Sequence, residues 1–240
     1  MAVQPWRVGK VIRIENHTPT TRQFWIEVPE MDKFDFKPGQ FVTLDLPIHE
    51  KPNKRWRSYS IASWPDGSNV FELLIVRAMG GLGTAYLFDE VKVGSELTFR
   101  GAQGVFALPE TLDKDIFLIC TGTGIAPFRS MVKHIELTGK SCKNIHLIFG
   151  CRKKEDLLYY DELKALEKST NWFHYYPTLS RETEPGMLHG YVHPVYETLC
   201  HDNQPANFFL CGWKHMIDEA IKHINRLGYD TKSIHREIYG

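Results

Sequence analysis

The sequence predicts two domains, an antiparallel β-barrel followed by an α/β domain with a parallel sheet. Residues up to about 110 contain short β patterns that Gly- and Pro-containing turns separate. From Ile116 onward, apolar strands alternate with helical patterns, which is typical of a parallel sheet covered on both faces. The Pro- and charge-bearing stretch Leu108–Asp115 separates the two regimes, so domains at 1–110 and 111–240 are expected.

Composition excludes several classes of protein. The 240 residues carry 29 basic and 29 acidic side chains, without the basic excess of a general nucleic-acid or anionic-membrane binder. No apolar run has the roughly 18 residues of a membrane span, and the N-terminal residues lack the apolar core of a signal peptide. Five scattered cysteines without CxxC spacing argue against a metal, a cluster or a disulfide framework. A cytoplasmic protein without a metal is therefore expected, with a monomer favoured.

About six strands and one short helix are predicted in the first domain. Lys37-Pro38-Gly39, Pro65-Asp66-Gly67 and Val93-Gly94 are turn signals between these strands. The predicted strands are Val8–Ile14, Gln23–Val28, Gln40–Leu46, Trp56–Ile61, Val70–Val76 and Glu96–Phe99, and the helix is Thr84–Glu90. This spacing favours a barrel or a sandwich.

Two stretches of the first domain suit a phosphate-bearing ligand. In Arg57-Ser58-Tyr59-Ser60, an arginine at a strand end can neutralise a phosphate, and Tyr59 shares its face and can stack on a flat ring. In Gly80-Gly81-Leu82-Gly83-Thr84, glycines at a helix entry can cradle a phosphate, with Thr84 able to cap the helix or to donate its hydroxyl. An ordinary edge strand and a flexible loop explain each stretch singly. Together they favour a diphosphate ligand.

The second domain is predicted to alternate strands and helices. The strands are Ile116–Thr121, Asn144–Gly150, Trp172–Thr178, Phe208–Cys211 and Ile234–Ile238, and the helical stretches are Pro127–Thr138, Tyr160–Lys168, Val192–Cys200 and Met216–Leu227. Ligands of such sheets bind at the carboxyl ends of the strands. The residues expected there are Thr121–Thr123, Gly150–Arg152, Leu179–Arg181 and Cys211–Gly212.

The turn Thr121-Gly122-Thr123-Gly124 joins the first of these strands to a helix that Pro127 opens. Backbone N–H groups at such a helix start attract a phosphate, and glycine permits its close approach. Pro127 stands where the usual dinucleotide fingerprint has its third glycine. A plain strand-to-helix turn explains the glycines equally well when they are taken alone.

Arg152 and Ser180-Arg181 are expected at neighbouring strand ends, where they suit an additional phosphate such as the 2′-phosphate of NADPH. Flanking charges, among them Lys153 and Glu182, leave solvated surface as the alternative. Cys211-Gly212 ends a buried strand, where a cysteine can contact a ring, act as a nucleophile or simply fill the core.

Taken in order, these motifs resemble the ferredoxin–NADP⁺ reductase family over nearly the whole chain. Arg57-x-Tyr59-Ser60 resembles the flavin signature, and the segment Gly122–Ser130 resembles the pyrophosphate loop. Ser180-Arg181-Glu182, Cys211–Met216 and Glu237-Ile-Tyr239 resemble the 2′-phosphate segment, the late Cys-Gly motif and the acid-x-aromatic ending.

The resemblance implies a barrel that binds FAD, a second domain that binds NADPH, and FAD in the cleft between them. The implied FAD-binding residues are Arg57, Tyr59, Ser60, Ile75, Val76, Arg77, Gly81, Leu82, Gly83, Thr84 and Tyr239. The implied NADPH-binding residues are Gly122, Thr123, Gly124, Pro127, Ser180, Arg181, Cys211 and Gly212, to which the strand-end pattern adds Arg152. Ser60, Cys211, Glu237 and Tyr239 would act catalytically, with Tyr239 stacked on the flavin until the nicotinamide displaces it.

The chain also departs from the family pattern. Gly240 follows the aromatic residue with which plant-type members end, and Trp213 and His215 vary the Cys-Gly motif. No plastid transit segment precedes the barrel pattern, so a compact bacterial-type enzyme is expected.

Three functions remain open at the level of sequence. The first is an NADPH-dependent FAD reductase that exchanges electrons with a separate ferredoxin or flavodoxin. The second is a flavin reductase or an oxygenase reductase component that uses NADH or NADPH. The third, from another class, is a flavin-carrying electron conduit or regulatory subunit without nucleotide turnover.

Overall fold

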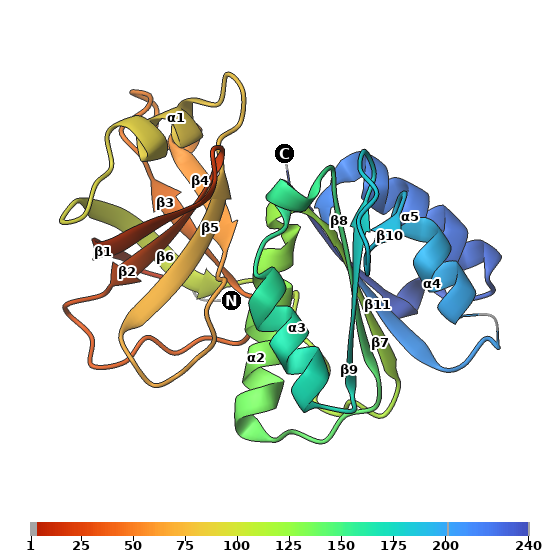
Figure 1. Ribbon diagram of the computed structural model, residues 1–240. Helices are drawn as coiled ribbons and strands as arrows, with labels where there is room; N and C mark the ends of the chain where they lie inside the picture. Colours follow the sequence, from red (N-terminus) through yellow and green to blue (C-terminus); the bar gives the residue numbers. More distant parts are fainter. Residues whose placement is uncertain (1–3, 201, 240) are drawn as a thin grey trace. The chain divides into compact units, whose positions relative to one another are not determined.

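A computed structural model describes residues 4–200 and 202–239. These residues form two compact units, and each contains its own sheet (Figure 1). The first unit runs to Leu108 and also includes Ala126–Thr138; the second comprises Pro109–Ile125 and the chain from Gly139 onward. Gly240, which follows Tyr239, lies outside the described residues.

The first unit is a six-stranded antiparallel sheet in the order β4-β3-β6-β1-β2-β5. Its strands are β1 (Trp6–Thr18), β2 (Thr21–Glu27), β3 (Phe41–Asp45), β4 (Trp56–Ser60), β5 (Val70–Val76) and β6 (Glu96–Gln103). A bridge between Ile61 and Leu73 joins the first strand of this order to the last and closes a barrel. The predicted barrel is thereby confirmed.

Side chains that point to alternate faces of each strand fill the inside of the barrel with apolar groups. Val42 and Leu44 of β3 point inward, as do Phe71 and Leu73 of β5, and all four are fully buried. A period of two residues is what a strand needs to bury one face. The helix α1 (Leu82–Asp89) follows β5, and the 3₁₀ turn η1 (Pro52–Lys54) precedes β4.

The second unit holds a six-stranded parallel sheet in the order β10-β9-β8-β7-β11-β12. Its strands are β7 (Asp115–Thr121), β8 (Ile145–Cys151), β9 (Phe173–Leu179), β10 (Leu188–His189), β11 (Ala206–Trp213) and β12 (Ile234–Tyr239). The helices are α3 (Tyr160–Ser169), α4 (His193–Leu199) and α5 (Lys214–Arg226), and three 3₁₀ turns, η2 (Gly122–Ile125), η3 (Lys154–Asp156) and η4 (Thr231–Ser233), complete the unit. The predicted α/β domain is confirmed.

Stacked rings run across four strands of this sheet. Phe208, Phe117, His146 and His174 are in-register neighbours on β11, β7, β8 and β9. Their ring centroids are 5.1, 4.8 and 5.0 Å apart in that order, close to the spacing of strands. Helices α4 and α5 pack their apolar residues on this face of the sheet (Figure 1).

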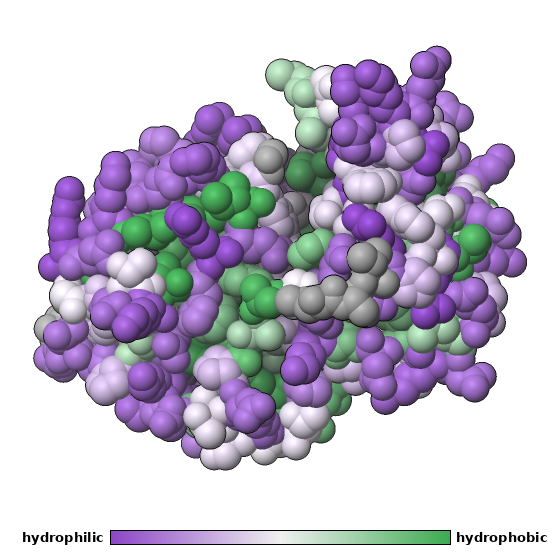
Figure 2. Space-filling model, turned by 180° about the vertical axis from the view of Figure 1, so that it is seen from behind, coloured by the Kyte–Doolittle hydropathy of each residue, from purple (hydrophilic) through white to green (hydrophobic). Residues whose placement is uncertain are grey.

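The helix α2 (Ala126–Thr138) follows η2 directly in the chain but packs in the first unit. Pro127 lies in its first turn, as the sequence predicts, and Gly139 ends it with a left-handed φ of 62°. Proline is tolerated there because the first turn of a helix has no acceptor for its N–H group. The face of the protein in Figure 2 is mainly hydrophilic, with hydrophobic residues in separate patches.

Candidate cofactor sites

Arg57 and Tyr59 lie on the same face of β4, opposite Leu44 and Val42 of β3. Tyr59 packs against the barrel core, and this burial raises its pKa to about 12, although nearby Arg57 opposes the rise. The phenol therefore stays neutral. The guanidinium of Arg57 donates to the carbonyl oxygens of Lys54 and Trp56 at 3.1 and 2.8 Å. No acidic side chain of the described residues pairs with it, so its charge is available to an anion.

Helix α1 begins beside this arginine. A Cβ atom at Gly83 would lie 3.0 Å from Cγ of Arg57, so the absence of a side chain lets Arg57 cross the first turn of the helix. Gly81 is the N-cap residue and has no side chain to cap the N–H groups. An arginine over a helix N-terminus combines two attractions for phosphate. The two phosphate-suited stretches of the sequence thus lie next to each other in the first unit.

Thr84 corrects one expectation. The helix starts at Leu82, so Thr84 lies inside the first turn rather than at the cap. Its hydroxyl accepts from the N–H group of Ala78 at 3.1 Å and donates to the carbonyl of Gly81 at 3.1 Å. These bonds hold the glycine loop against the helix entry.

The three residues at the end of β5 differ in their surroundings. Ile75 is a core residue with 2% exposure, and Val76 is half-buried. Arg77 forms a two-bond ion pair with Asp89, at the other end of α1, with distances of 2.8 and 2.7 Å. Its charge is therefore already partnered, in contrast to that of Arg57. Ser60, at the end of β4, is buried.

In the second unit, the two glycines after β7 have different surroundings. Gly122 has a positive φ of 55°, and a Cβ there would meet nothing within 4 Å. A Cβ at Gly124 would lie 2.4 Å from the carbonyl oxygen of Cys211, so this glycine lets η2 contact β11 closely. Gly122 is thus the position that a phosphate can approach, and Thr123 beside it is buried.

Thr121, Cys211 and Gly212 meet where β7 and β11 end. Gly212 has a φ of 136°, and a Cβ there would lie 2.6 Å from Oγ1 of Thr121. That hydroxyl is buried and has no hydrogen-bond partner among the described residues. A buried group left unsatisfied carries a free-energy cost that a ligand can remove. Glycines and an orphaned hydroxyl at this edge fit a nucleotide.

Cys211 is fully buried, and burial raises the pKa of its thiol well above the ordinary value, with Glu237 adding to the rise. A thiol that stays protonated is a poor nucleophile, so the ring-contact and core interpretations are favoured. The side chain of Tyr239 hydrogen-bonds to this sulfur. Parallel pairing of β12 with β11 brings these groups together, because Glu237 lies opposite Cys211 and Tyr239 opposite Trp213.

The loops after β8 and β9 are joined through their backbones. The N–H groups of Ser180 and Arg181 donate to the carbonyl oxygens of Cys151 and Arg152 at 3.0 and 2.9 Å. Arg152 and Arg181 are exposed, and within the described part of the chain neither has an acidic partner. Two neighbouring arginines with uncompensated charge suit a phosphate monoester.

Tyr191 is a residue that the sequence analysis missed. It is 73% exposed and follows β10, which pairs with the end of β9. The N–H group of the preceding Gly190 donates to the carbonyl of Leu179 at 2.9 Å, which places Tyr191 beside Ser180-Arg181. The signal in the sequence was an aromatic residue after a glycine, a few residues beyond the arginine.

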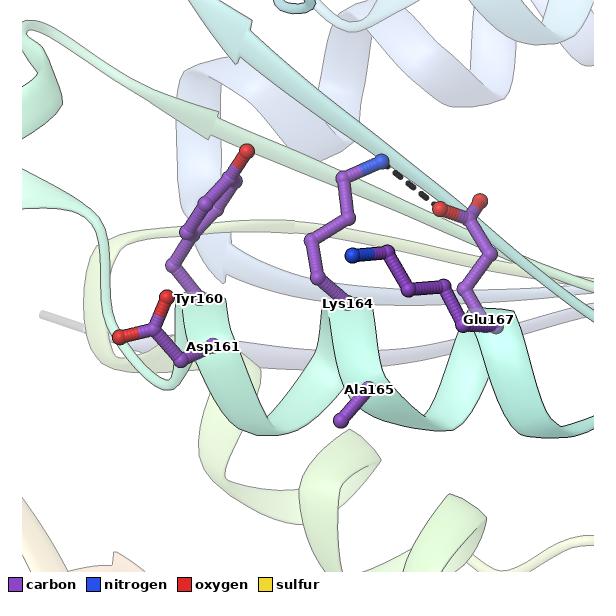
Figure 3. A pocket seen from close by; sticks show the side chains of 6 residues that line it. Tyr160, Asp161, Lys164, Ala165 and Glu167 are labelled. Carbon is purple, nitrogen blue, oxygen red and sulfur yellow. Dashed lines mark hydrogen bonds and ion pairs between the residues drawn. The ribbon is translucent and has the colours of Figure 1, made fainter.

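A hollow of about 370 Å³ lies along α3 and is lined by that helix alone (Figure 3). Lys164 and Glu167 form an ion pair there at 2.7 Å. None of its lining residues is a predicted cofactor residue. A ligand site gathers polar groups from several elements, so this hollow is not a candidate.

The described residues contain no group of three or more His, Cys, Asp or Glu residues placed to hold a metal ion. None of their helices combines the length and the apolar character that a bilayer crossing requires. All five cysteines are free thiols.

Comparison with protein families identifies both halves of the chain. Residues 9–108 match the oxidoreductase FAD-binding domain, and residues 118–222 match the oxidoreductase NAD-binding domain. Ferredoxin–NADP reductase B of Sorangium cellulosum is 32% identical, and the match covers 96% of both chains. The reductase component of propane 2-monooxygenase from Mycolicibacterium goodii is also 32% identical, but this chain spans only 61% of its length.

Solved structures agree with these matches. A ferredoxin NADP⁺ reductase from Neisseria gonorrhoeae, determined with bound FAD and NADP, has a TM-score of 0.82 and 27% identity, and the match covers 97% of this chain and 98% of that one. A cytochrome P450 reductase from Amycolatopsis has a TM-score of 0.87 and 26% identity; the match covers 99% of this chain and 71% of that one.

Proposed function

Because this chain belongs to the ferredoxin–NADP⁺ reductase family, we propose that it is an NADPH-dependent FAD enzyme that exchanges electrons with a separate ferredoxin or flavodoxin. The observation that carries the proposal is the position of Arg57 across the first turn of α1, 3.0 Å from where a Gly83 Cβ would stand. That arrangement brings the two phosphate-suited motifs of the barrel together, which supports a single diphosphate site there.

The barrel residues would bind FAD. Arg57 and the N-terminus of α1 would hold its pyrophosphate, and the neutral ring of Tyr59 would pack against the isoalloxazine. Gly81, Gly83 and Thr84 shape the helix entry that the phosphates approach. When bound, FAD supplies the redox chemistry, accepting a hydride and passing on single electrons.

The strand ends of the second unit would bind NADPH. Gly122 offers the open backbone for the pyrophosphate, and the hydroxyl of Thr121 offers an unsatisfied hydrogen-bonding group. Arg152 and Arg181 would bind the 2′-phosphate, with the exposed ring of Tyr191 available to stack on the adenine. This pair of arginines supports NADPH over NADH.

Ser60 in the first unit and Cys211, Glu237 and Tyr239 in the second are the residues that we assign to the flavin and nicotinamide rings. Cys211 would contribute a neutral, packed thiol, because burial keeps it protonated. Glu237 would supply charge or a proton at the exposed edge of β12. Tyr239 would leave its hydrogen bond to Cys211 in order to shield the flavin.

A ferredoxin or flavodoxin is the proposed partner for one-electron exchange. The described residues hold no cysteine cluster that could carry an iron–sulfur centre, and a ferredoxin or flavodoxin would supply the one-electron carrier. The relative from Sorangium cellulosum, which this chain matches over nearly its full length, is named for ferredoxin.

The test is spectroscopic. The purified protein should be yellow from bound FAD, and anaerobic titration with NADPH should bleach it with one equivalent per flavin. Reduced enzyme should then reduce a ferredoxin or a flavodoxin in stopped flow. The proposal would be wrong if the purified protein bound no FAD, or if its flavin stayed oxidised in the presence of NADPH.

A reductase component for an oxygenase is the second candidate, favoured by the similarity to the propane 2-monooxygenase reductase. Comparable kcat/KM values for NADH and NADPH, with electron delivery to an oxygenase, would select it. The third hypothesis is an electron conduit without nucleotide turnover. It predicts that the protein has no diaphorase activity with any dye.

A further inference from the structure

Arg129 is a buried arginine of α2 that binds residues of the barrel. Its side chain is 8% exposed, and Nη1 donates to the carbonyl oxygen of Ala62 at 3.0 Å and to Oε2 of Glu72 at 2.7 Å. Glu72 lies on β5 and is 14% exposed. A buried ion pair with a further hydrogen bond holds two elements in one geometry more rigidly than a surface pair does.

The carboxylate of Glu72 is itself held in place. Nε2 of Gln23 on β2 donates to Oε2 of Glu72 at 2.5 Å, and Oε1 of Gln23 contacts Nε2 of His17 on β1 at 2.5 Å. The ring of Trp64 lies 5.1 Å from the Arg129 guanidinium and 5.3 Å from Nζ of Lys133, one turn further along α2. A chain of hydrogen bonds therefore runs from Arg129 through Glu72 and Gln23 to His17, across three strands of the barrel.

Apolar packing reinforces this contact. The methyl group of Met131 lies where a Gly39 side chain would begin, 2.6 Å from an ideal Cβ, and Gly39 has a φ of 97°. The rings of Phe106 and Phe128 are 5.9 Å apart. A Cβ at Gly39 would clash first with the carbonyl oxygen of Phe106, at 1.8 Å, so Gly39 leaves room both for that carbonyl and for the end of the Met131 side chain from α2.

The same helix is continuous with the nucleotide loop. Arg129 comes two residues after Pro127, and α2 begins immediately after η2. A helix is stiff over one turn, so a side chain that fixes the first turn of α2 also fixes the end of the loop that precedes it. On the barrel side, Glu72 lies three residues before Ile75 on the strand that the flavin assignment includes.

We propose that the Arg129–Glu72 ion pair ties the nucleotide loop Gly122–Ile125 to the flavin-binding barrel, and that both are positioning residues for hydride transfer. This inference rests on the proposed function. Neither side chain needs to touch FAD or NADPH, because each acts through the backbone that it anchors. Hydride transfer depends steeply on the placement of donor and acceptor, so a small displacement of the loop has a large effect on rate.

Glu72→Gln tests the inference, because it keeps the size and a hydrogen-bond acceptor but removes the charge. Glu30→Gln is the matched control, since Glu30 pairs with Arg7 on the same barrel and is 52% exposed. Arg129→Lys is the second variant, which keeps the positive charge but cannot reproduce the planar donor geometry. All are studied as full chains loaded with FAD.

Three quantities are measured for each variant: FAD content, the rate of flavin reduction at saturating NADPH, and hydrogen exchange of the amides in 117–130. We expect Glu72→Gln to keep FAD, to reduce its flavin at least about tenfold more slowly, and to exchange faster in the loop. The KM for NADPH should change less than about twofold, because the phosphate contacts remain. Arg129→Lys should fall between Glu72→Gln and the wild type.

Unchanged reduction rate and unchanged loop exchange in Glu72→Gln would overturn the inference. Loss of FAD, or faster exchange across the whole barrel, would also overturn it, because the pair would then serve folding alone. If NADPH leaves the wild-type flavin oxidised, the proposed function fails on the wild type. The exchange comparison still decides whether the pair anchors the loop.

Discussion

At Gly83, one substitution should have opposite effects on the stability of the helix and on the binding of the cofactor. Alanine suits a helix better than glycine by about 1 kcal/mol, so Gly83→Ala should leave the fold intact or slightly stabilised. The new Cβ would lie 3.0 Å from Cγ of Arg57 and 3.3 Å from Nε, which forces the guanidinium aside. We expect FAD affinity to fall about tenfold while the melting temperature of flavin-free protein stays the same or rises. Unchanged FAD affinity in a titration would show that Arg57 is not a phosphate ligand.

Arg181 is the residue that should separate the two nicotinamide nucleotides. A hydrogen-bonded charge pair contributes about 1.5–3 kcal/mol, so Arg181→Ala should lower kcat/KM for NADPH roughly ten- to hundredfold. The value for NADH should change less than twofold, because NADH lacks the 2′-phosphate. Lys153→Ala is the control, since Lys153 lies on the neighbouring loop and pairs with Glu155. Equal losses with both nucleotides would assign Arg181 to the fold instead.

At the scale of elements, the stacked rings across β11, β7, β8 and β9 make the stability of the second unit depend on pH. Burial, and then the neighbouring His174, lower the pKa of His146 to about 4, while Asp115 opposes the shift. An unfolded histidine titrates near 6.5, so between pH 6.5 and 4 the unfolded chain binds more protons. Stability is therefore full above pH 6.5 and falls by up to about 3 kcal/mol as the pH drops to 4.

Replacing His146 with phenylalanine isolates this contribution. His146→Phe keeps a ring between Phe117 and His174 and removes the titrating group, at the cost of the 3.3 Å hydrogen bond to Tyr176. Its unfolding free energy should be within about 1 kcal/mol of the wild type at pH 7. Between pH 6.5 and 4.5 it should decline less steeply in denaturant titrations. Parallel declines in both proteins would place the acid sensitivity elsewhere.

Most elements could be predicted from sequence because their apolar periods are strong. The predicted strand Val70–Val76 coincides with β5, and the parallel strands lie within about two residues of their predicted bounds. The two-residue β10 was missed because so short a segment has no period, and Tyr191 was missed with it. The predicted strand Glu96–Phe99 ends four residues before β6, which continues through Gly101 to Gln103.

The sites could be predicted in part, for a related reason. Motif order placed Arg57, Gly122 and Arg181 at strand ends, where chain topology alone puts them. Sequence could not distinguish Gly122, which faces open space, from Gly124, which packs on Cys211. Nor could it show that Arg77 is already paired with Asp89, whereas Arg57 has no acidic partner among the residues that the structure describes. Those differences depend on contacts between segments far apart in the chain.

At the scale of the whole molecule, we expect α2 to couple the stabilities of the two units. The helix packs in the first unit but is joined at both ends to segments of the second. Unfolding of the second unit would pull on both ends of α2 and strain the contact between Arg129 and Glu72, which lie 2.7 Å apart in the first unit. We expect one calorimetric transition with equal calorimetric and van't Hoff enthalpies. Two resolved transitions in the FAD-loaded protein would show that the units melt independently.

The membership of α2 in the first unit also matters while the protein is being synthesised. The barrel strands are complete once Gln103 has left the ribosome, but Glu72 and Gln23 then still lack the arginine that they bind. At about 5–20 residues per second, Thr138 follows roughly two to seven seconds later. During that interval the nascent barrel leaves exposed two features that α2 later covers. They are the carboxylate of Glu72 and the apolar surface around Gly39 and Phe106. The first unit therefore completes its folding only after the ribosome has already synthesised part of the second unit.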